Sequence, residues 1–294
     1  MYILYIIKME NCNQCTSIEY FYKPSKKCDN DKVNKMRENI IKQLLEKKDI
    51  EYCDKCKEKY LQLKNNFDNI FTDIYNRRFD NYEVISKGGR GCKCDYELIF
   101  YYKDNEKYVV NLEFKYGTTK ITGCPQFLNQ PAKNCDYHKF YYESFLTKLN
   151  EKYNFTSPSF NIYEKEIFKN SSNNEYFINL KEKDVKGSQF KKDKDKFVKD
   201  SIYKYLSNYK VDYNYWQDKF KEQNRKIFLL CKNGKFYVDK FSNKELTLKN
   251  EHYIKNKNTI VLKTNTSSEI HMLLRWKNRL GVLLPAWQVK LVRL

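Results

Sequence analysis

Residues 88–126 read GGRGCKCDYELIFYYKDNEKYVVNLEFKYGTTKITGCPQ. Apolar and polar side chains alternate over residues 94–102 and again over residues 108–116, which predicts two β-strands. The polar residues between them, KDNEK, predict a short turn that pairs the two strands as a hairpin. A further short strand is expected over residues 82–86, just before a glycine-rich turn. The centre of the fold is therefore a β-structure that carries charged side chains.

The charged side chains of the hairpin fall on one face of each strand. Successive side chains of a β-strand point to opposite faces of the sheet. Asp95 and Glu97 therefore share one face of the first strand, and Glu113 and Lys115 share one face of the second. If the strands pair through the short turn, Asp95 and Glu113 converge on one side. The sequence thus predicts two carboxylates and an ammonium group at one place.

This combination of groups suits metal-assisted cleavage of a phosphodiester bond. Mg²⁺ takes oxygen ligands and keeps several waters, so two carboxylates, a backbone carbonyl and water satisfy it. The ion lowers the pKa of a bound water and stabilises charge on the phosphate. A lysine beside that water helps to orient or deprotonate it. The adjoining turn, Gly88-Gly89-Arg90-Gly91, adds a close backbone approach and an arginine, both suited to a phosphate.

The motif resembles the PD-(D/E)XK nuclease superfamily. Asp95 matches the acid of the superfamily's first motif strand, and Glu113-Phe114-Lys115 matches its acid-x-lysine element. The proline that precedes the acid in the superfamily's motif is replaced by Cys94. This departure leaves the acid and the acid-x-lysine element in their expected order.

The resemblance covers residues 33–150 and implies a restriction-endonuclease-like fold, in which helices flank a mixed central sheet. It implies that Asp95 and Glu113 bind Mg²⁺ or Mn²⁺, with the Phe114 carbonyl as a further ligand. It also implies that Lys115 acts on the attacking water and that the substrate is DNA. From the resemblance we expect a magnesium-dependent deoxyribonuclease.

Two further residues match auxiliary positions found in some branches of the superfamily. In some branches a glutamine lies on the helix that follows the lysine strand, and Gln126 matches this position. Gln126 therefore joins the catalytic candidates. The alternative is that Gln126 is an ordinary residue at the start of a helix. A glutamate on the first helix corresponds to Glu38, for which a plain surface position is the alternative.

The order of the predicted elements indicates an α/β (α+β) fold class with an added β-rich C-terminal part. We expect a Cys-containing polar segment at residues 1–31, a nuclease core at 32–155, a helical variable segment at 156–225 and a β-rich subdomain at 226–294. Asn233-Gly234 marks a hairpin at the start of that subdomain. Helices are predicted over 33–48, 56–76, 136–153, 188–209 and 212–223, with a short one opening at 125–130, and strands over 258–264, 269–278 and 281–292.

The chain is strongly basic. Its 294 residues include 56 Lys and Arg against 37 Asp and Glu, a formal net charge of +19. Such a field attracts polyanions and speeds their encounter, which makes nucleic acid the expected partner. A lysine-biased surface that only maintains solubility, acidic membranes and acidic proteins are alternatives that charge alone leaves open.

Other classes of function find less support in the sequence. The three histidines never cluster, which argues against a histidine-based nuclease, and no Walker-type GK[ST] loop indicates an ATPase. No apolar run approaches the length of about 20 residues that a membrane span needs, so we expect a soluble, intracellular protein without a membrane partner. A homodimer is expected for a restriction-type cutter, although no stretch of the sequence marks an interface.

The cysteines allow an alternative reading. The pairs Cys12/Cys15 and Cys53/Cys56 have the spacing of zinc knuckles, which together could supply four thiolates to a structural Zn²⁺. The gap between the pairs is longer than in a compact ribbon, so we favour unrelated reduced thiols. Besides the favoured nuclease, two functions therefore stay open: a catalytically silent nucleic-acid-binding protein of the same fold, and a zinc-ribbon-bearing interaction module.

Overall fold

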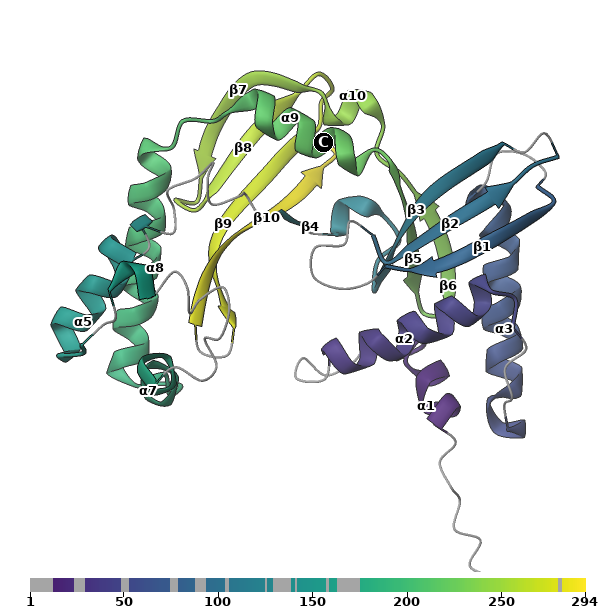
Figure 1. Ribbon diagram of the computed structural model, residues 1–294, viewed down its shortest axis with the longest axis horizontal. Coiled ribbons are helices and arrows are strands. Elements are labelled where there is room, and N and C mark those ends of the chain that lie inside the picture. Colours follow the sequence, from purple (N-terminus) through teal and green to yellow (C-terminus); the bar gives the residue numbers. More distant parts are fainter. Residues whose placement is uncertain are drawn as a thin grey trace, which may run out of the picture. The chain divides into compact units, whose positions relative to one another are not determined.

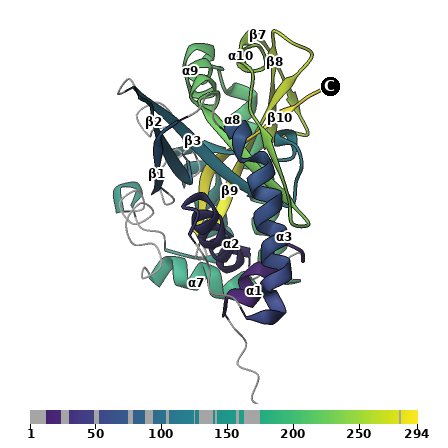
Figure 2. The same cartoon turned by 90° about the vertical axis from the view of Figure 1, so that its right-hand side faces the viewer.

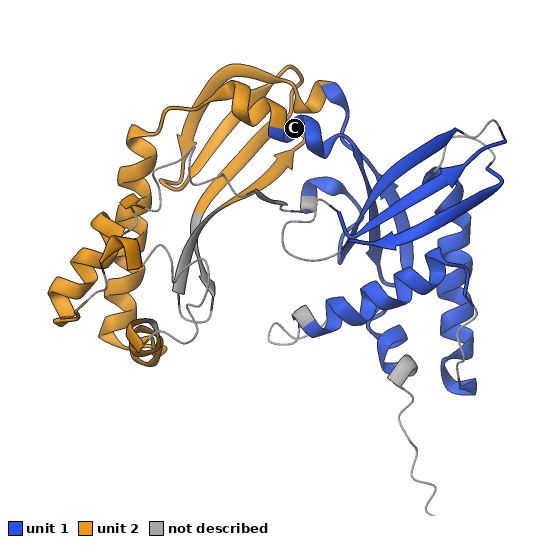
Figure 3. Ribbon diagram, in the orientation of Figure 1, with its two compact units in different colours: residues 1–124, 219–243 blue, residues 125–218, 244–294 orange. Residues whose placement is uncertain are grey.

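The structure, a computed structural model, divides into two compact units (Figure 3). Unit 1 comprises Met1–Cys124 and Lys219–Asn243, and unit 2 comprises Pro125–Asp218 and Lys244–Leu294. Each unit thus consists of two segments, and the segments of the two units alternate along the sequence. The residues that the structure describes are 13–23, 30–48, 53–74, 79–87, 94–103, 106–124, 126–128, 139–140, 142–156, 159–162, 175–279 and 282–294.

Unit 1 is built on a five-stranded mixed sheet. Its strands, in sheet order, are β1 (Asn81–Ser86), β2 (Tyr96–Tyr101), β3 (Lys107–Tyr116), β5 (Lys226–Lys232) and β6 (Lys235–Asp239) (Figure 1). β5 runs parallel to β3, whereas the other neighbours are antiparallel. The predicted hairpin is confirmed, because Tyr96 lies opposite Leu112 and Tyr101 lies opposite Lys107.

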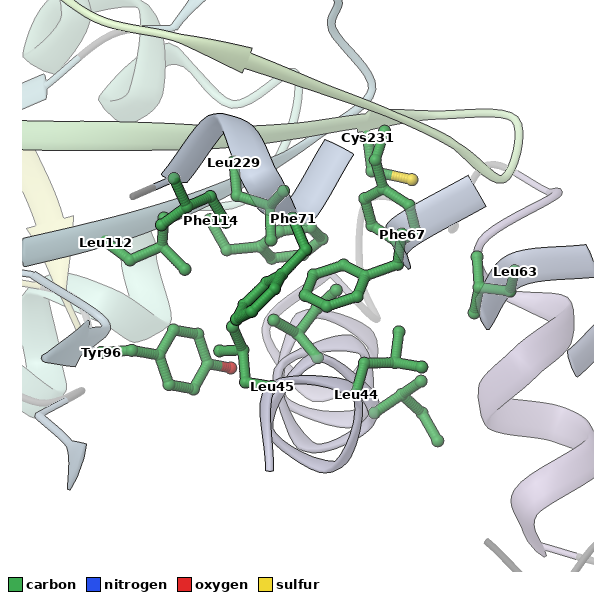
Figure 4. Close-up of a cluster of buried hydrophobic side chains, with 14 of the residues drawn as sticks. Leu44, Leu45, Leu63, Phe67, Phe71, Tyr96, Leu112, Phe114, Leu229 and Cys231 are labelled. Carbon is green, nitrogen blue, oxygen red and sulfur yellow. The ribbon is translucent and has the colours of Figure 1, made fainter. Parts of the chain in front are cut away.

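Three helices cover one face of this sheet: α1 (Asn13–Glu19), α2 (Asn30–Leu45) and α3 (Asp54–Phe71) (Figures 1 and 2). Apolar residues recur on one side of α2 and α3 at helical spacing, as predicted, and this side packs against the strands. Figure 4 shows the resulting core, in which side chains of β2, β3 and β5 meet those of the two longer helices. The labelled members are Leu44, Leu45, Leu63, Phe67, Phe71, Tyr96, Leu112, Phe114, Leu229 and Cys231.

The N-terminal segment takes part in this core. Ile18 and Phe21 are completely buried. The Phe21 ring lies 6.3 Å from that of Phe114 and 6.1 Å from that of Phe236, and the Phe21 carbonyl accepts a hydrogen bond from the Gly234 amide at 2.8 Å. Ile18 and Phe21, which lie within the expected polar segment at residues 1–31, therefore belong to the core of unit 1.

The expected boundaries of the nuclease core and the C-terminal subdomain also differ from the structure. We expect the hairpin of β5 and β6 in the β-rich subdomain at residues 226–294. It instead completes the first sheet by pairing with β3. Ile227, Leu229 and Cys231 alternate along β5 and join the core beneath the sheet. Parallel pairing across an insertion of this length leaves no local signal in the sequence, which explains the error.

Unit 2 contains a second, antiparallel sheet of five strands. In sheet order they are β4 (Gln126–Leu128), β10 (Val282–Val292), β9 (Glu269–Arg279), β8 (Thr259–Thr264) and β7 (Leu248–Lys255). Trp287 of β10 is fully buried, with its ring 5.7 Å from that of Trp216. The helices that the structure describes in this part include α5 (Thr147–Tyr153), α7 (Glu175–Lys183), α8 (Gln189–Asn208), α9 (Tyr213–Gln223) and α10 (Asn243–Leu246), and the last two cross a boundary between the units.

Two sheets with flanking helices confirm the expected α/β (α+β) class. The strands predicted over 258–264, 269–278 and 281–292 are present, whereas the short helix expected at 125–130 is replaced by β4. None of the helices in the described part of the chain is long and apolar enough to cross a membrane.

Candidate active site

The acidic residues of the hairpin lie on the face of the first sheet that points away from α1, α2 and α3. Leu112 and Phe114 of β3 belong to the core that these helices cover. Because neighbouring side chains of a strand point to opposite faces, Glu113 and Lys115 lie on the other face. That face is only partly open, since Glu113 is 9% exposed.

Asp95 is fixed beside these residues by three hydrogen bonds. Its amide donates to the Leu112 carbonyl at 3.1 Å, and its carbonyl accepts from the Lys87 amide at 2.8 Å. Its carboxylate oxygen Oδ2 accepts from the Phe114 amide at 2.8 Å. The side chain of Asp95 thus reaches over β3, next to Glu113. The structure brings together the two carboxylates that the alternation of residues predicts.

Two lysines neutralise Glu113. Lys115 Nζ donates to Glu113 Oε1 at 2.6 Å. Lys226, the first residue of β5, places its Nζ 3.5 Å from Glu113 Oε2 and is 7% exposed. Lys226 is absent from the site predicted from the sequence, although the strand that it begins is predicted. Only the pairing of β5 with β3 reveals that Lys226 belongs to this cluster.

The electrostatics of the cluster follow from burial and from close charges. Burial, and then the Glu113 carboxylate, raise the pKa of Asp95 to about 6, with Lys115 acting in the opposite direction. Burial by itself lowers the pKa of Lys115, but the Glu113 and Asp95 carboxylates outweigh it and raise this pKa above its usual value. Lys115 therefore stays charged at neutral pH, whereas Asp95 changes its charge within the accessible pH range.

The donor atoms of the cluster fit a hard divalent cation. Asp95 uses only Oδ2 in its hydrogen bond to β3, so Oδ1 makes no hydrogen bond to the described residues. Carboxylate and carbonyl oxygens are the ligands that Mg²⁺ prefers. No group of three or more His, Cys, Asp or Glu residues that could hold a metal ion occurs among the described residues. A metal at this place would therefore need backbone carbonyl or water ligands besides the two carboxylates.

Glu38 of α2 lies within electrostatic reach of this cluster. Its backbone carbonyl accepts a hydrogen bond from the Tyr96 hydroxyl at 2.5 Å, which ties α2 to the start of β2. Its carboxylate makes a small contribution to the raised pKa of Asp95, after burial and Glu113. Glu38 also forms an ion pair with Lys35 at 3.4 Å. The structure thus brings the first-helix glutamate near Asp95.

Gln126 does not occupy its predicted place. It begins β4 and pairs with Val289 of β10, so it belongs to the sheet of unit 2 and not to a helix that follows β3. Its assignment to the catalytic group rested on that helix and is therefore not supported. The glycine-rich turn Gly88-Gly89-Arg90-Gly91 lies outside the described residues, and Lys87 and Cys94 flank the gap.

The cysteines near the cluster are buried thiols. Burial raises the pKa of Cys94 to about 11, and its thiol donates to Asn111 Oδ1 at 3.5 Å. Burial also raises the pKa of Cys124. Thiols of this kind are protonated at neutral pH and do not act as nucleophiles.

The proposed zinc site would need four cysteines, and the structure describes the side chains of only two of them, Cys53 and Cys56. Cys12 and the side chain of Cys15 lie outside the described residues. The Sγ atoms of Cys53 and Cys56 are 3.8 Å apart at the start of α3. This distance suits a thiol–thiol contact and also the edge of a zinc–thiolate tetrahedron with bonds of about 2.3 Å.

No family model matches the chain, and comparisons with curated proteins and with solved structures found no match either.

Proposed function

We propose that the protein is a Mg²⁺-dependent nuclease that hydrolyses phosphodiester bonds of DNA, with Asp95, Glu113 and Lys115 as its catalytic residues. One observation carries the proposal. The Phe114 amide holds the Asp95 carboxylate against β3 at 2.8 Å, where Glu113 and Lys115 share the same face. Two carboxylates, one with an oxygen left unbonded, and a charged lysine are the groups that this reaction requires. The resemblance of this segment to PD-(D/E)XK nucleases supports the same conclusion.

Asp95 and Glu113 would hold the metal ion, and the Phe114 carbonyl is a further candidate ligand. When bound, the ion would supply Lewis acidity and a water of lowered pKa. Without a metal, Lys115 and Lys226 balance the charge of the buried Glu113. This balance lets a carboxylate persist in a site where an unpaired charge would be strongly unfavourable.

Lys115 has two tasks in this proposal. It holds Glu113 in place through the 2.6 Å contact, and its charge would face the attacked phosphate. An ammonium group there orients the attacking water and stabilises the negative charge that develops on the phosphate oxygens. The net charge of +19 favours the approach of DNA to the protein.

A cleavage assay tests the proposal. Supercoiled, linear and single-stranded DNA are incubated with the protein in Mg²⁺ or in EDTA. We expect cleavage in Mg²⁺ only, and its loss in Asp95→Ala and Lys115→Ala. Lys186→Ala is the matched control, because Asp184-Val185-Lys186 is another acid-x-lysine sequence whose lysine is exposed.

Absence of cleavage on all substrates, or equal cleavage by the variants, would contradict the proposal. DNA binding without cleavage would favour the silent binding protein of the same fold. One tightly bound zinc per chain, with no Mg²⁺-dependent cleavage, would favour the zinc-bearing interaction module.

A further inference from the structure

A cavity of about 570 Å³ adjoins the candidate active site within unit 1. It lies where Asn111 of β3 pairs with Lys226 of β5, and both residues line it. Lys226 also contacts Glu113 at 3.5 Å, so one side chain connects the cavity with the catalytic carboxylate. The volume lies within the range of pockets that bind small ligands, about 300–1,000 Å³.

Basic side chains line the cavity. Its cations are Arg225, Lys226 and Lys240, and its carboxylates are Asp73 and Asp239. Lys226 is already paired with Glu113, so its charge is not counted toward a ligand. Arg225 makes no hydrogen bond or ion pair within the described part of the chain, so its guanidinium can bind two phosphate oxygens at once. This guanidinium suits a single phosphate group.

The remaining lining suits a nucleobase. Tyr108 is 38% exposed, and its ring offers a surface for stacking. Asn111 uses its Oδ1 to accept from the Cys94 thiol, which leaves its Nδ2 to donate to a base. Asn224 donates its Nδ2 to Asn243, which leaves its Oδ1 to accept from a base. The cavity therefore combines phosphate-binding, stacking and hydrogen-bonding groups.

We propose that this cavity is a subsite for one nucleotide of the bound strand, next to the phosphate that is cut. Arg225 binds its phosphate, and Tyr108 and Asn111 contact its base. The placement beside the cut phosphate rests on the proposed function. The nucleotide-binding property of the cavity does not depend on catalysis.

Binding of thymidine 5′-monophosphate in EDTA tests the subsite directly. Isothermal titration calorimetry compares it with thymidine and with inorganic phosphate on the full chain. We expect the nucleotide to bind more tightly than either part alone. Arg225→Met should weaken nucleotide binding by about tenfold, which corresponds to about 1.4 kcal/mol. Tyr108→Ala should weaken binding of the nucleotide but not of phosphate, and Lys186→Met should bind like the wild type.

Three outcomes would overturn the subsite: no nucleotide binding at millimolar concentration, equal binding by Arg225→Met, or equal affinity for phosphate and nucleotide. Asp95→Asn separates this inference from the proposed function, because it should bind the nucleotide normally while failing to cut DNA. A wild type that binds the nucleotide but never cuts DNA would sustain the subsite and overturn the nuclease.

Discussion

The carboxylate of Asp95 accepts a hydrogen bond from the backbone amide of Phe114 at 2.8 Å, across the β2–β3 pair. The acid side chain thereby binds the backbone of the strand that carries Glu113 and Lys115. Together with the backbone hydrogen bonds of Asp95 to Leu112 and Lys87, this contact fixes the orientation of Asp95 at the start of the hairpin. We regard this link as the structural basis of the candidate site, and the predictions below depend on it.

Asp95→Asn should stabilise the protein at neutral pH. Burial, and then the Glu113 carboxylate, raise the pKa of Asp95 from its ordinary value of 3.8 to about 6 in the folded protein. The folded state therefore binds more protons between these values, and the stability that protonated Asp95 contributes is lost as the pH rises through about 6. Thermal unfolding in EDTA should show the variant as more stable than the wild type at pH 7.5, with the difference shrinking toward pH 4. A wild type that stays more stable than the variant at pH 7.5 would contradict this.

Glu38→Gln should shift the acid limb of the pH–rate profile to lower pH. Burial and Glu113 account for most of the raised pKa of Asp95, and the Glu38 carboxylate adds to it. Removing this charge lets Asp95 ionise at a lower pH, so the ionised form that would bind the proposed metal persists further into the acid range. Cleavage rates between pH 5 and 8 measure the shift, and Glu58→Gln, on an exposed position of α3, serves as the control. Identical acid limbs in Glu38→Gln and the wild type would show that Glu38 does not act on Asp95.

Lys226→Met should lose stability in EDTA and regain part of it in Mg²⁺. The variant leaves Glu113 with one cation instead of two, and an under-compensated buried group costs about 1–3 kcal/mol. A divalent cation at Glu113 would replace the missing charge. Lys194→Met is the matched control, since Lys194 is 8% exposed and pairs with Asp184 in unit 2. Recovery in both variants, or in neither, would contradict a metal site at Glu113.

Gly234→Ala should destabilise unit 1 more than Gly187→Ala destabilises unit 2. Both glycines have positive φ, 73° and 89°, which disfavours alanine by about 1 kcal/mol at either position. A Cβ on Gly187 meets nothing within 4 Å, whereas a Cβ on Gly234 overlaps the Tyr22 ring. This overlap should add about 1–3 kcal/mol. Urea unfolding measures both losses, and equal losses would mean that the N-terminal segment does not pack on the β5–β6 turn.

The local pattern of the sequence is sufficient to predict the hairpin and its charged face. Alternation places Asp95, Glu113 and Lys115 correctly, because a two-residue period leaves each side chain only one of two faces. The amphipathic stripes of α2 and α3 are predictable for a similar reason. These elements depend on interactions between residues close in the chain.

The remaining features depend on contacts between distant segments. Lys226 reaches Glu113 only because β5 pairs with β3 after the first segment of unit 2, Pro125–Asp218, has intervened. Gln126 was assigned to a helix, but its segment completes the edge of a second sheet formed by the end of the chain. Phe21 lies in a polar stretch, and its burial becomes evident only once the β5–β6 turn contacts it. No local periodicity encodes such pairings.

The proposed role of a metal ion at Glu113 and Asp95 in the hydrolysis of DNA is tested by single-turnover cleavage of a labelled duplex. The cleavage rate is measured as a function of Mg²⁺ concentration for the wild type, Glu113→Gln and Lys186→Ala. We expect saturable, Mg²⁺-dependent cleavage by the wild type and by Lys186→Ala. We expect a rate at least about 100-fold lower for Glu113→Gln, which is the scale of losing a group that stabilises the transition state. Equal rates for the wild type and Glu113→Gln at every Mg²⁺ concentration would show that no metal at Glu113 takes part in the reaction.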